Sequence, residues 1–359
     1  MSLHCARLAV LGSRALPRLV ISGNKIFDEY GNNLTGKLRG VNIQGVTWID
    51  FGDGYVWPNP EQQFRFMQQW GINIIRFCFE EYVIRWEWPK ESTKANMDNL
   101  VQLAAQYGIY VIFSGWHLHS NSTFPFNNDM SAWTDANWNA WKSHWVEIAK
   151  RYKGKNVIYD LLNEPLYLYR ESQQVYFRDC IDAIRVEDPD AIVMVEQSSQ
   201  SSWGGNDLTF EQTHPINRPN IIFSGHAYYS SDHFFIPPNN SLEYIRSTID
   251  TRRPGWGWCL ANNRPVFIGE TNANRSAGLA PADVIALQNM YTVYAERYAG
   301  WATWQWMGSG GDYPLISDWN ATPTDQGLVL QEYLPVLDNP RLTVQSSPIQ
   351  NIPFTVRRL

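Results

Sequence analysis

The chain has 359 residues and a net charge of −6, with 29 Lys and Arg residues against 35 Asp and Glu residues. Hydrophobic residues make up 44% of the sequence and charged residues only 18%, a composition that excludes a disordered chain or a coiled coil. No stretch of the sequence approaches the roughly 18 consecutive apolar residues of a membrane-spanning helix. The mild acidity, without a run of Lys or Arg, argues against nucleic acid or a membrane surface as a partner.

The two ends of the chain are expected to lie outside the folded domain. Residues 1–18 contain Arg but no acidic residue, and Arg14 and Pro17 interrupt the apolar core of a secretory signal, so this segment is interpreted as a leader or a disordered segment. From Leu19, alternating apolar residues on either side of residues 31–33 predict a short β-hairpin. Residues 337–359 contain three prolines and no helical period, which predicts a tail. One domain is therefore expected over residues 19–336.

Short apolar runs without alternation predict strands that are covered on both faces, as in a parallel sheet. These runs are 38–43, 72–77, 110–116, 157–162, 191–195, 221–224, 265–269 and 301–306. Helical patterns lie between most of them, at 61–70, 97–107, 135–152, 173–186, 242–251 and 282–298, whereas 198–220 is interpreted as a loop. The alternation predicts an α/β fold, a single (β/α)8 TIM barrel with a short N-terminal hairpin. A doubly wound sheet is disfavoured because no G-x-G-x-x-G motif follows the first strand.

Aromatic residues are unusually frequent, with 17 Trp and 18 Tyr. Large flat rings suit stacking on the apolar faces of sugar rings, so the composition points towards a carbohydrate ligand. Trp138, Trp141 and Trp145 are expected to pack instead, because their spacing of three and four residues is that of a buried helix face. The four cysteines are too far apart for a zinc or redox motif and are expected to be mostly buried free thiols. No metal or cofactor is expected.

Polar side chains lie at the predicted carboxyl ends of the strands, where the active sites of barrels are found. Two of them are glutamates: Glu164 follows the fourth strand and Glu270 follows the seventh. Cleavage of a glycosidic bond needs two such carboxyls, one protonated to assist the leaving oxygen and one ionised to attack the anomeric carbon or activate water. The other candidates at these ends are Arg76, His117, Asn163, His226, Tyr228 and Trp304.

The surroundings of the two glutamates are expected to separate their pKa values. Arg76 should favour the charged form of Glu270, and Tyr228 could donate a hydrogen bond to the same carboxylate. Glu164 has apolar neighbours in the sequence and should stay protonated more easily. Asn163 is placed to bind a sugar hydroxyl beside the reacting carbon.

Several motifs follow one another at the spacing of barrel strands. After the segment G-N-K-I-F-D-E-Y-G-N-N-L and the strand L-R-G-V-N-I, they read N-I-I-R-F, Y-V-I-F-S-G-W-H, V-I-Y-D-L-L-N-E-P, S-G-H-A-Y, V-F-I-G-E, W-A-T-W and D-W-N-A-T-P-T-D-Q-G. In this order they resemble glycoside hydrolase family 5, a cellulase-like family of clan A retaining glycosidases. The resemblance covers nearly all of the chain from residue 19 to about residue 334.

The resemblance implies roles for the matching residues. It implies that Glu164 is the acid/base and Glu270 the nucleophile, which gives a covalent glycosyl-enzyme and net retention of configuration. It also implies that Arg76 and Tyr228 hold the nucleophile and that Asn163 binds the 2-hydroxyl of the sugar.

The same resemblance implies that His117 and His226 line the cleavage subsite and that Trp304 stacks beneath its sugar. The chain departs from the family at the third strand, where Ser-Gly precedes Trp-His, so His119 remains an alternative to His117. Trp306 is an alternative to Trp304. Further tryptophans that follow strand ends are possible subsite platforms, namely Trp48, Trp116 and Trp203.

We expect an endo-acting β-1,4-glucanase that hydrolyses cellulose or a related β-glucan by double displacement. A β-mannanase or another β-glycan hydrolase of the same family is the alternative, because the catalytic residues do not distinguish these substrates. A carbohydrate-binding protein without catalysis is a second class, which the presence of both glutamates disfavours. A polysaccharide substrate implies a secreted protein, and we expect a monomer.

Overall fold

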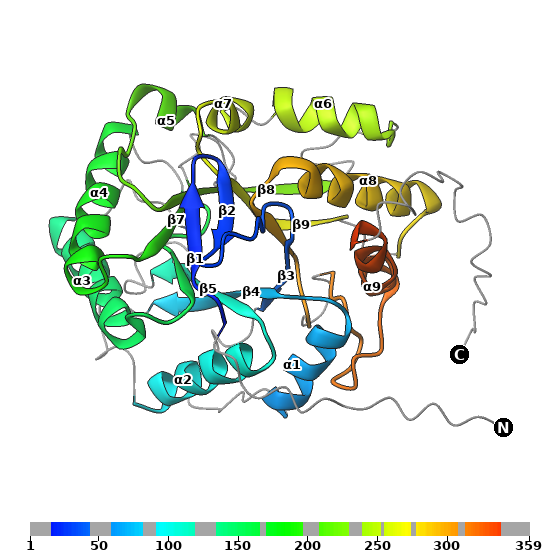
Figure 1. Ribbon diagram of the computed structural model, residues 1–359, viewed down its shortest axis with the longest axis horizontal. Coiled ribbons are helices and arrows are strands. Elements are labelled where there is room, and N and C mark those ends of the chain that lie inside the picture. The colour runs from blue at the N-terminus through cyan, green and yellow to red at the C-terminus, as the bar shows by residue number, and fades with distance from the viewer. Residues whose placement is uncertain are drawn as a thin grey trace.

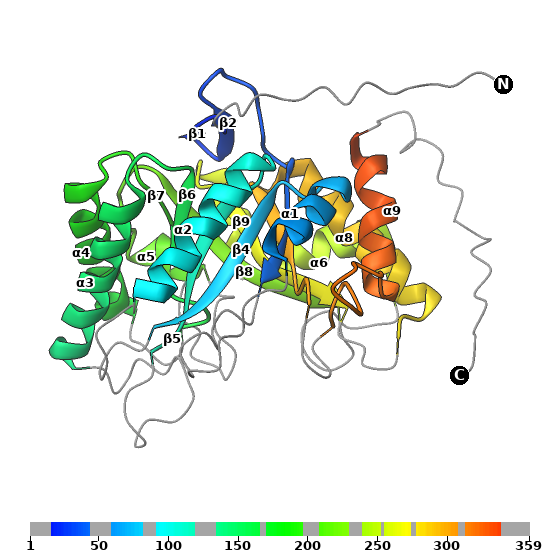
Figure 2. The ribbon, with the colours of Figure 1, turned by 90° about the horizontal axis from the view of Figure 1, so that it is seen from below.

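The computed structural model describes residues 16–43, 59–81, 91–118, 134–165, 170–196, 208–229, 239–252, 255–273, 278–307 and 313–338. In these residues, parallel strands close into a barrel that helices surround (Figures 1 and 2). The barrel strands are β3 (Leu38–Ile43), β4 (Ile74–Glu81), β5 (Tyr110–Leu118), β6 (Val157–Asp160), β7 (Ile192–Glu196), β8 (Ile221–Tyr229), β9 (Val266–Ala273) and β10 (Gly300–Thr303). β10 pairs with both β3 and β9, which closes the ring of eight, so the predicted (β/α)8 barrel is confirmed.

The helices follow the strands in the order expected of a β/α barrel. They are α1 (Pro60–Gln69), α2 (Glu91–Gln106), α3 (Asp135–Tyr152), α4 (Arg170–Glu187), α5 (Thr209–Thr213), α6 (Leu242–Arg252), α7 (Trp256–Ala261), α8 (Pro281–Arg297) and α9 (Asp325–Asp338). The six predicted helices are all present, but α2 begins six residues before its predicted start and α4 three, whereas the other ends shift by at most one residue. The single turn α5 lies in the stretch interpreted as a loop, and α7 and α9 were not predicted. None of the helices in the described ranges has the length and apolar character needed to cross a lipid bilayer.

The N-terminal hairpin is present, but the predicted position of its turn is wrong. β1 (Leu19–Ser22) and β2 (Lys25–Asp28) pair antiparallel around a turn at Gly23 and Asn24, not at residues 31–33. Gly23 has a φ of 61°, a left-handed conformation that glycine adopts without steric cost. A second turn follows at residues 28–32, in which the Gly31 N–H donates to the Asp28 carbonyl at 2.9 Å and the Asp28 carboxylate accepts the N–H of Asn32 at 2.8 Å. Asn33 then pairs antiparallel with Phe27.

The hairpin lies across the amino-terminal end of the barrel (Figure 2). Its Leu19 and Ile26 side chains join an apolar cluster that fills this end of the barrel interior. The structure also places residues 16–18 against this end: the Tyr110 hydroxyl donates to the carbonyl of Pro17 at 2.9 Å, and Arg18 forms an ion pair with Asp190 at 2.8 Å.

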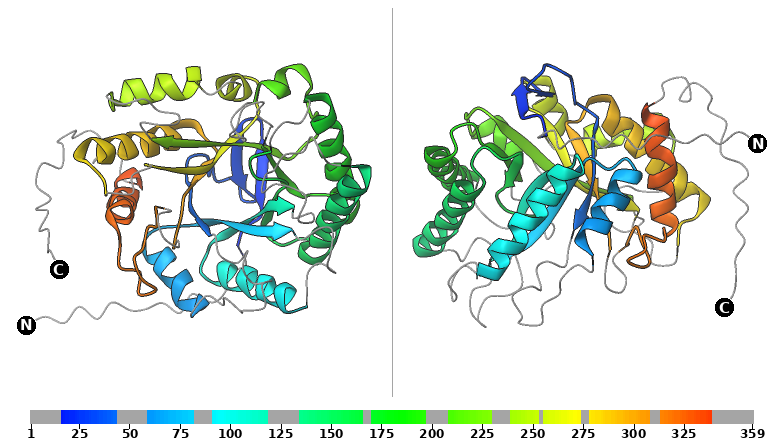
Figure 3. Two further views of the ribbon diagram at one scale, coloured as in Figure 1. Left: turned by 180° about the vertical axis from the view of Figure 1, so that it is seen from behind. Right: turned by 60° about the horizontal axis from the view of Figure 1, so that its bottom comes forward.

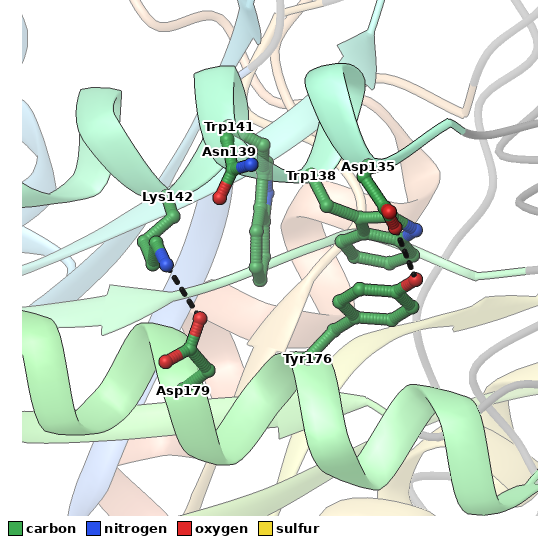
Figure 4. A pocket seen from close by; sticks show the side chains of 7 residues that line it. All are labelled: Asp135, Trp138, Asn139, Trp141, Lys142, Tyr176 and Asp179. Atoms are coloured by element: carbon green, nitrogen blue, oxygen red, sulfur yellow. Dashed lines mark hydrogen bonds and ion pairs between the residues drawn. The ribbon is translucent and has the colours of Figure 1, made fainter.

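A second apolar core lies between the strands and the surrounding helices, and the tryptophans of α3 belong to it. Trp138, Trp141 and Trp145 are at most 4% exposed, which confirms the prediction that they pack. α3 and α4 lie side by side on the outside of the barrel (Figure 3). Between them is a pocket of about 180 Å³, where Trp138 stacks on Tyr176 with ring centroids 4.0 Å apart (Figure 4). Tyr176 covers this face of the Trp138 indole, so the face is not available to stack on a sugar.

The cysteines that the structure describes are buried free thiols, as predicted. They are Cys78, Cys180 and Cys259, whereas Cys5 lies outside the described residues. Burial raises the pKa of the Cys259 thiol to about 12, so this cysteine is protonated and unreactive at neutral pH.

Candidate active site

Polar and charged side chains gather at the carboxyl ends of the barrel strands, although most of the barrel interior is apolar. β8 and β9 run several residues beyond their predicted ends, so His226, Tyr228 and Glu270 lie within strands. A register shift between Gly225 and His226, where β8 pairs with β9, sets His226 opposite Glu270. Such irregularities re-aim side chains, and here the two side chains lie at the same end of the barrel.

Arg76 in β4 is the centre of this group and is completely buried. Its guanidinium forms ion pairs with three carboxylates, at 2.8 Å to Asp160, 2.9 Å to Glu196 and 3.0 Å to Glu270. It also donates to the side-chain oxygen of Asn163 at 2.8 Å. The planar guanidinium suits several acceptors at once, and its buried charge is tolerated because these carboxylates compensate it.

Glu270 is 5% exposed and each of its carboxylate oxygens has a hydrogen-bond donor. Arg76 donates to Oε1 at 3.0 Å, and the Tyr228 hydroxyl donates to Oε2 at 2.6 Å. Burial raises the pKa of Glu270 and the neighbouring Glu164 raises it further, whereas His226, Arg76 and Tyr228 lower it, and the net direction is upward. Arg76 therefore acts in the predicted direction, but desolvation in the barrel outweighs it.

Glu164 follows β6 and has a left-handed backbone, with a φ of 43°. This conformation costs a residue other than glycine on the order of 1 kcal/mol. The Glu164 N–H donates to Oε2 of Glu196 at 2.8 Å, which helps to hold the turn in place. The side chain is 28% exposed, much more than that of Glu270, so Glu164 lies on the solvent side of the pair.

His226 lies between three carboxylates. Its Nδ1 is 2.8 Å from Oε1 of Glu164 and 3.5 Å from Oε2 of Glu270, and its Nε2 is 3.0 Å from Oε1 of Glu196. Burial by itself lowers the pKa of His226, but the three carboxylates raise it well above its usual range. The imidazole is therefore protonated at neutral pH, and both of its nitrogens donate hydrogen bonds.

The spacing of the two candidate catalytic carboxyls decides which chemistry they suit. Oxygen atoms of Glu164 and Glu270 and a ring nitrogen of His226 lie within 4.8 Å of one another. Carboxyl groups about 5–5.5 Å apart are typical of retaining glycosidases, whereas inverting enzymes need about 6.5–9.5 Å. The same spacing could hold a cation, but the His226 imidazolium and Arg76 already supply positive charge there. We therefore assign no metal to these residues.

The remaining predicted site residues are only partly described. Trp304 directly follows β10, not within the strand as predicted, and is 8% exposed. Its alternative, Trp306, is completely buried and donates its indole N–H to Gln63 at 3.0 Å, so it belongs to the core. The backbone of Trp116 and His117 forms part of β5, but their side chains lie outside the described part of the structure, as do His119, Trp48 and Trp203.

Three buried polar residues that contact the site were not predicted as members of it, and each contacts Arg76. Asn42 is the second-to-last residue of β3, and its side-chain oxygen accepts a hydrogen bond from Arg76 at 3.2 Å. Asp160 and Glu196 are the last residues of β6 and β7, respectively. Glu196 closes an apolar run, which is the same sequence signal that identified Glu164 and Glu270, whereas Asp160 lies within the apolar run 157–162.

A (β/α)8 barrel with two closely spaced carboxyls at the carboxyl end of its strands defines a class of protein, the barrel glycoside hydrolases. Comparison with protein families agrees with this class. A sequence model described as cellulase (glycosyl hydrolase family 5) matches residues 27–310, and the chain belongs to this family.

Curated relatives are endoglucanases of bacteria and fungi. Endoglucanase E-5 of Thermobifida fusca is 25% identical over 293 residues, which cover 80% of this chain and 55% of that protein. Endo-beta-1,4-glucanase B of Aspergillus niger is 23% identical over 314 residues, which cover 81% of this chain and 86% of that protein. The chain spans about half the length of the bacterial endoglucanases that it matches.

Solved structures share the fold. The β-glucanase SdGluc5_26A of Saccharophagus degradans, in complex with cellotetraose, superposes with a TM-score of 0.72 and 20% identity, covering 90% of this chain and 94% of that one. The catalytic domain of Thermobifida fusca endoglucanase Cel5A superposes with a TM-score of 0.66 and 22% identity, covering 89% of this chain and 98% of that one.

Proposed function

We propose that the chain is an endo-acting β-1,4-glucanase that hydrolyses internal bonds of cellulose or a related β-glucan with retention of configuration. The observation that carries this proposal is the pair formed by Glu164 and Glu270, whose carboxyl oxygens approach within 4.8 Å at the carboxyl end of the barrel. Such a close approach favours direct attack by a carboxylate over attack by a water held between the sugar and Glu270.

The surroundings of the two carboxyls support one role for each. Glu270 is buried, and its oxygens are fixed by Arg76 and Tyr228, as a nucleophile that must meet one carbon atom requires. Glu164 lies on the solvent side, where it can reach both the leaving oxygen and an incoming water. Asn163, adjacent to Glu164, is the proposed ligand of the sugar 2-hydroxyl.

The reaction takes two steps. In the first, a carboxylate oxygen of Glu270 bonds to the anomeric carbon, the glycosidic bond breaks, and Glu164 gives its proton to the leaving oxygen. In the second, Glu164 takes a proton from water as the water oxygen attacks the anomeric carbon, which releases Glu270 as a carboxylate. The positive charges of Arg76 and His226 stabilise the carboxylate form of Glu270 against the effect of its burial.

The names of the relatives support β-glucan as the substrate, because the curated relatives are endoglucanases and one similar structure contains cellotetraose. We propose Trp304 as the ring beneath the sugar in the cleavage subsite, and His117, Trp48, Trp116 and Trp203 as further contacts of the glucan chain. A polymer of this kind is met outside the cell, which supports secretion. Both carboxyls and their partners come from one chain, which supports activity as a monomer.

The first test is the release of reducing sugar from carboxymethyl-cellulose, barley β-glucan, mannan and xylan. We expect release from the two glucans, a rapid fall in viscosity, and the β-anomer as the first product in proton NMR. Glu270→Gln should lower kcat by about 10⁴-fold or more, because the nucleophile is lost. Glu164→Gln should lower it by about 10²–10⁴-fold.

Both variants should unfold at the temperature of the wild type within a few degrees, since each keeps the volume of the side chain. Activity chiefly on mannan would move the substrate to a mannan within the same mechanism. An α-anomer as first product, or an unchanged kcat in either variant, would overturn the proposed mechanism. Tight binding to a glucan without hydrolysis would indicate a carbohydrate-binding protein instead.

A further inference from the structure

Glu196, the last residue of β7, is a completely buried carboxylate that contacts three other parts of the site. Its Oε1 accepts from Arg76 at 2.9 Å and lies 3.0 Å from Nε2 of His226. Its Oε2 accepts the backbone N–H of Glu164 at 2.8 Å. Glu196 therefore joins groups from β4, from β8 and from the turn after β6.

We propose that Glu196 is a positioning residue of the site: it holds His226 as an imidazolium and Glu164 in its left-handed turn, so that His226 orients the Glu164 carboxyl. The Nδ1–H of His226 donates to Oε1 of Glu164 at 2.8 Å, so Oε2 is the oxygen that would carry the proton for the glycosidic oxygen in the proposed reaction. This inference rests on the proposed function, and it adds a residue that acts through two others and does not touch the sugar.

Of the carboxylates around His226, only Glu196 can provide a constant negative charge during the proposed reaction. Within the described residues, His226 faces Glu164 from the turn after β6, Glu196 from β7 and Glu270 from β9, and Arg76 compensates the latter two from β4. Glu164 changes its protonation in both steps of the proposed reaction, and Glu270 becomes a neutral ester in between. Glu196 is the one of these three carboxylates that keeps its charge throughout.

The direction of the pKa shift of Glu196 agrees with a carboxylate that stays ionised. Burial raises the pKa of Glu196, but His226, Arg76 and the N–H of Glu164 lower it, and the net direction is downward. A carboxylate that fixes an imidazole through its far nitrogen is a recurrent device for orienting a catalytic group, because it sets both the ring orientation and the positions of the protons.

The test compares Glu196→Gln with a matched control, Glu211→Gln. Glu211 on α5 is also buried, accepts a backbone N–H from Ile216 at 2.9 Å, and accepts from Arg264 at 2.7 Å. A glutamine at either position keeps the volume but loses the charge and offers only one acceptor oxygen. Both variants should therefore lose stability, but only Glu196→Gln should change the chemistry.

For Glu196→Gln we expect kcat on β-glucan to fall about 100-fold, as when an outer partner that orients a metal-binding histidine is lost. The loss should be smaller than the roughly 10⁴-fold seen when a histidine that itself transfers the proton loses its carboxylate, because His226 transfers no proton in the proposed steps. KM should change little, because Glu196 does not touch the substrate. The alkaline limb of the pH profile of kcat/KM should move down by about one unit or more, since removal of a negative charge loosens the proton on His226. Glu196→Asp keeps the charge, so it should retain the wild-type alkaline limb with a reduced kcat.

The charge of His226 can also be followed without activity, by ¹⁵N NMR of histidine-labelled protein, with His226→Asn to assign the signal. In the wild type and in Glu196→Asp the ring should stay protonated to a higher pH than in Glu196→Gln, where it should titrate at lower pH. An unchanged His226 titration in Glu196→Gln, or equal changes of pH profile in Glu211→Gln, would overturn the inference. Failure of the wild type to hydrolyse any glucan would refute the proposed function, whereas the NMR titration would still decide the part of Glu196.

Discussion

The two ends of the barrel interior differ sharply although they are built by the same strands. At the amino-terminal end the inward side chains are apolar and pack with the hairpin, and at the carboxyl end they are polar or charged. Side chains two residues apart lie on the same face of a strand, so the change occurs between consecutive inward positions. Three strands show it directly: Ile74 and Arg76 in β4, Ile158 and Asp160 in β6, and Met194 and Glu196 in β7.

The difference shows how the fold separates stability from chemistry. Apolar side chains at one end stabilise the closed barrel by burial, and they make no demand on their partners. The charged side chains at the other end pay a desolvation cost that only their mutual contacts offset. The left-handed backbone of Glu164 adds strain at this end. The apolar layer thus supports a site that is not stabilising by itself.

The difference between the two ends of the barrel should have its largest effect on stability at Arg76. Arg76→Met should lower the free energy of unfolding by about 3–5 kcal/mol, because three buried carboxylates lose their counter-charge. Part of the loss should return on acidification, when the carboxyls become protonated. Urea denaturation at pH 7 and pH 5 measures both effects.

The control for this variant is Arg151→Met, which removes an arginine paired with Asp98 on the exposed surface. A surface ion pair is typically worth less than about 1 kcal/mol. Equal losses in the two variants would show that the charges at the carboxyl end are not the costly part of the barrel.

The apolar end gives the second test. Ile222 in β8 is completely buried in the amino-terminal cluster, and Ile222→Ala should lower the free energy of unfolding by about 2–5 kcal/mol because it leaves a cavity. The kcat per folded molecule on β-glucan should stay at the wild-type value, since the site lies at the other end of the barrel. A loss of kcat in this variant at a temperature where it is fully folded would mean that the two layers are not separable.

The sequence was sufficient for the barrel because each strand carries its own signal, a short apolar run between helical patterns. It also predicted that Glu164, Glu270 and Arg76 lie at the same end of the barrel, since the carboxyl ends of the strands share one edge, and the structure places them there. Their catalytic roles stay a prediction. It did not identify Glu196 or Asp160 as partners of Arg76, because their contacts depend on ring closure and on side-chain length across the barrel.

Two further errors have local causes. The sequence predicts the hairpin turn at residues 31–33, but Gly23 forms it, and a turn signal is present in both segments because each contains a glycine with a positive φ. The ends of β8 and β9 were placed too early, because the runs continue through polar residues such as His226 and Glu270. Polar residues are usual at strand ends, but here they are buried in the barrel and remain paired.

Two histidines extend the comparison from the inside of the barrel to its outer layer, and they give the smallest predicted effect. Three carboxylates raise the pKa of His226, whereas burial on α3 lowers the pKa of His144 from 6.5 to about 4. The unfolded chain therefore binds more protons at position 144 between pH 6.5 and 4, so His144 should make the protein lose stability as the pH falls through this range.

His144→Gln should remove this part of the pH dependence. The variant should lose about 1–2 kcal/mol less than the wild type between pH 7 and pH 4, since the half-buried ring keeps part of its contact with water. Urea denaturation at several pH values measures the difference, with His214→Gln as the control on the surface turn after α5. Parallel stability curves for His144→Gln and the wild type would show that burial does not hold this ring neutral.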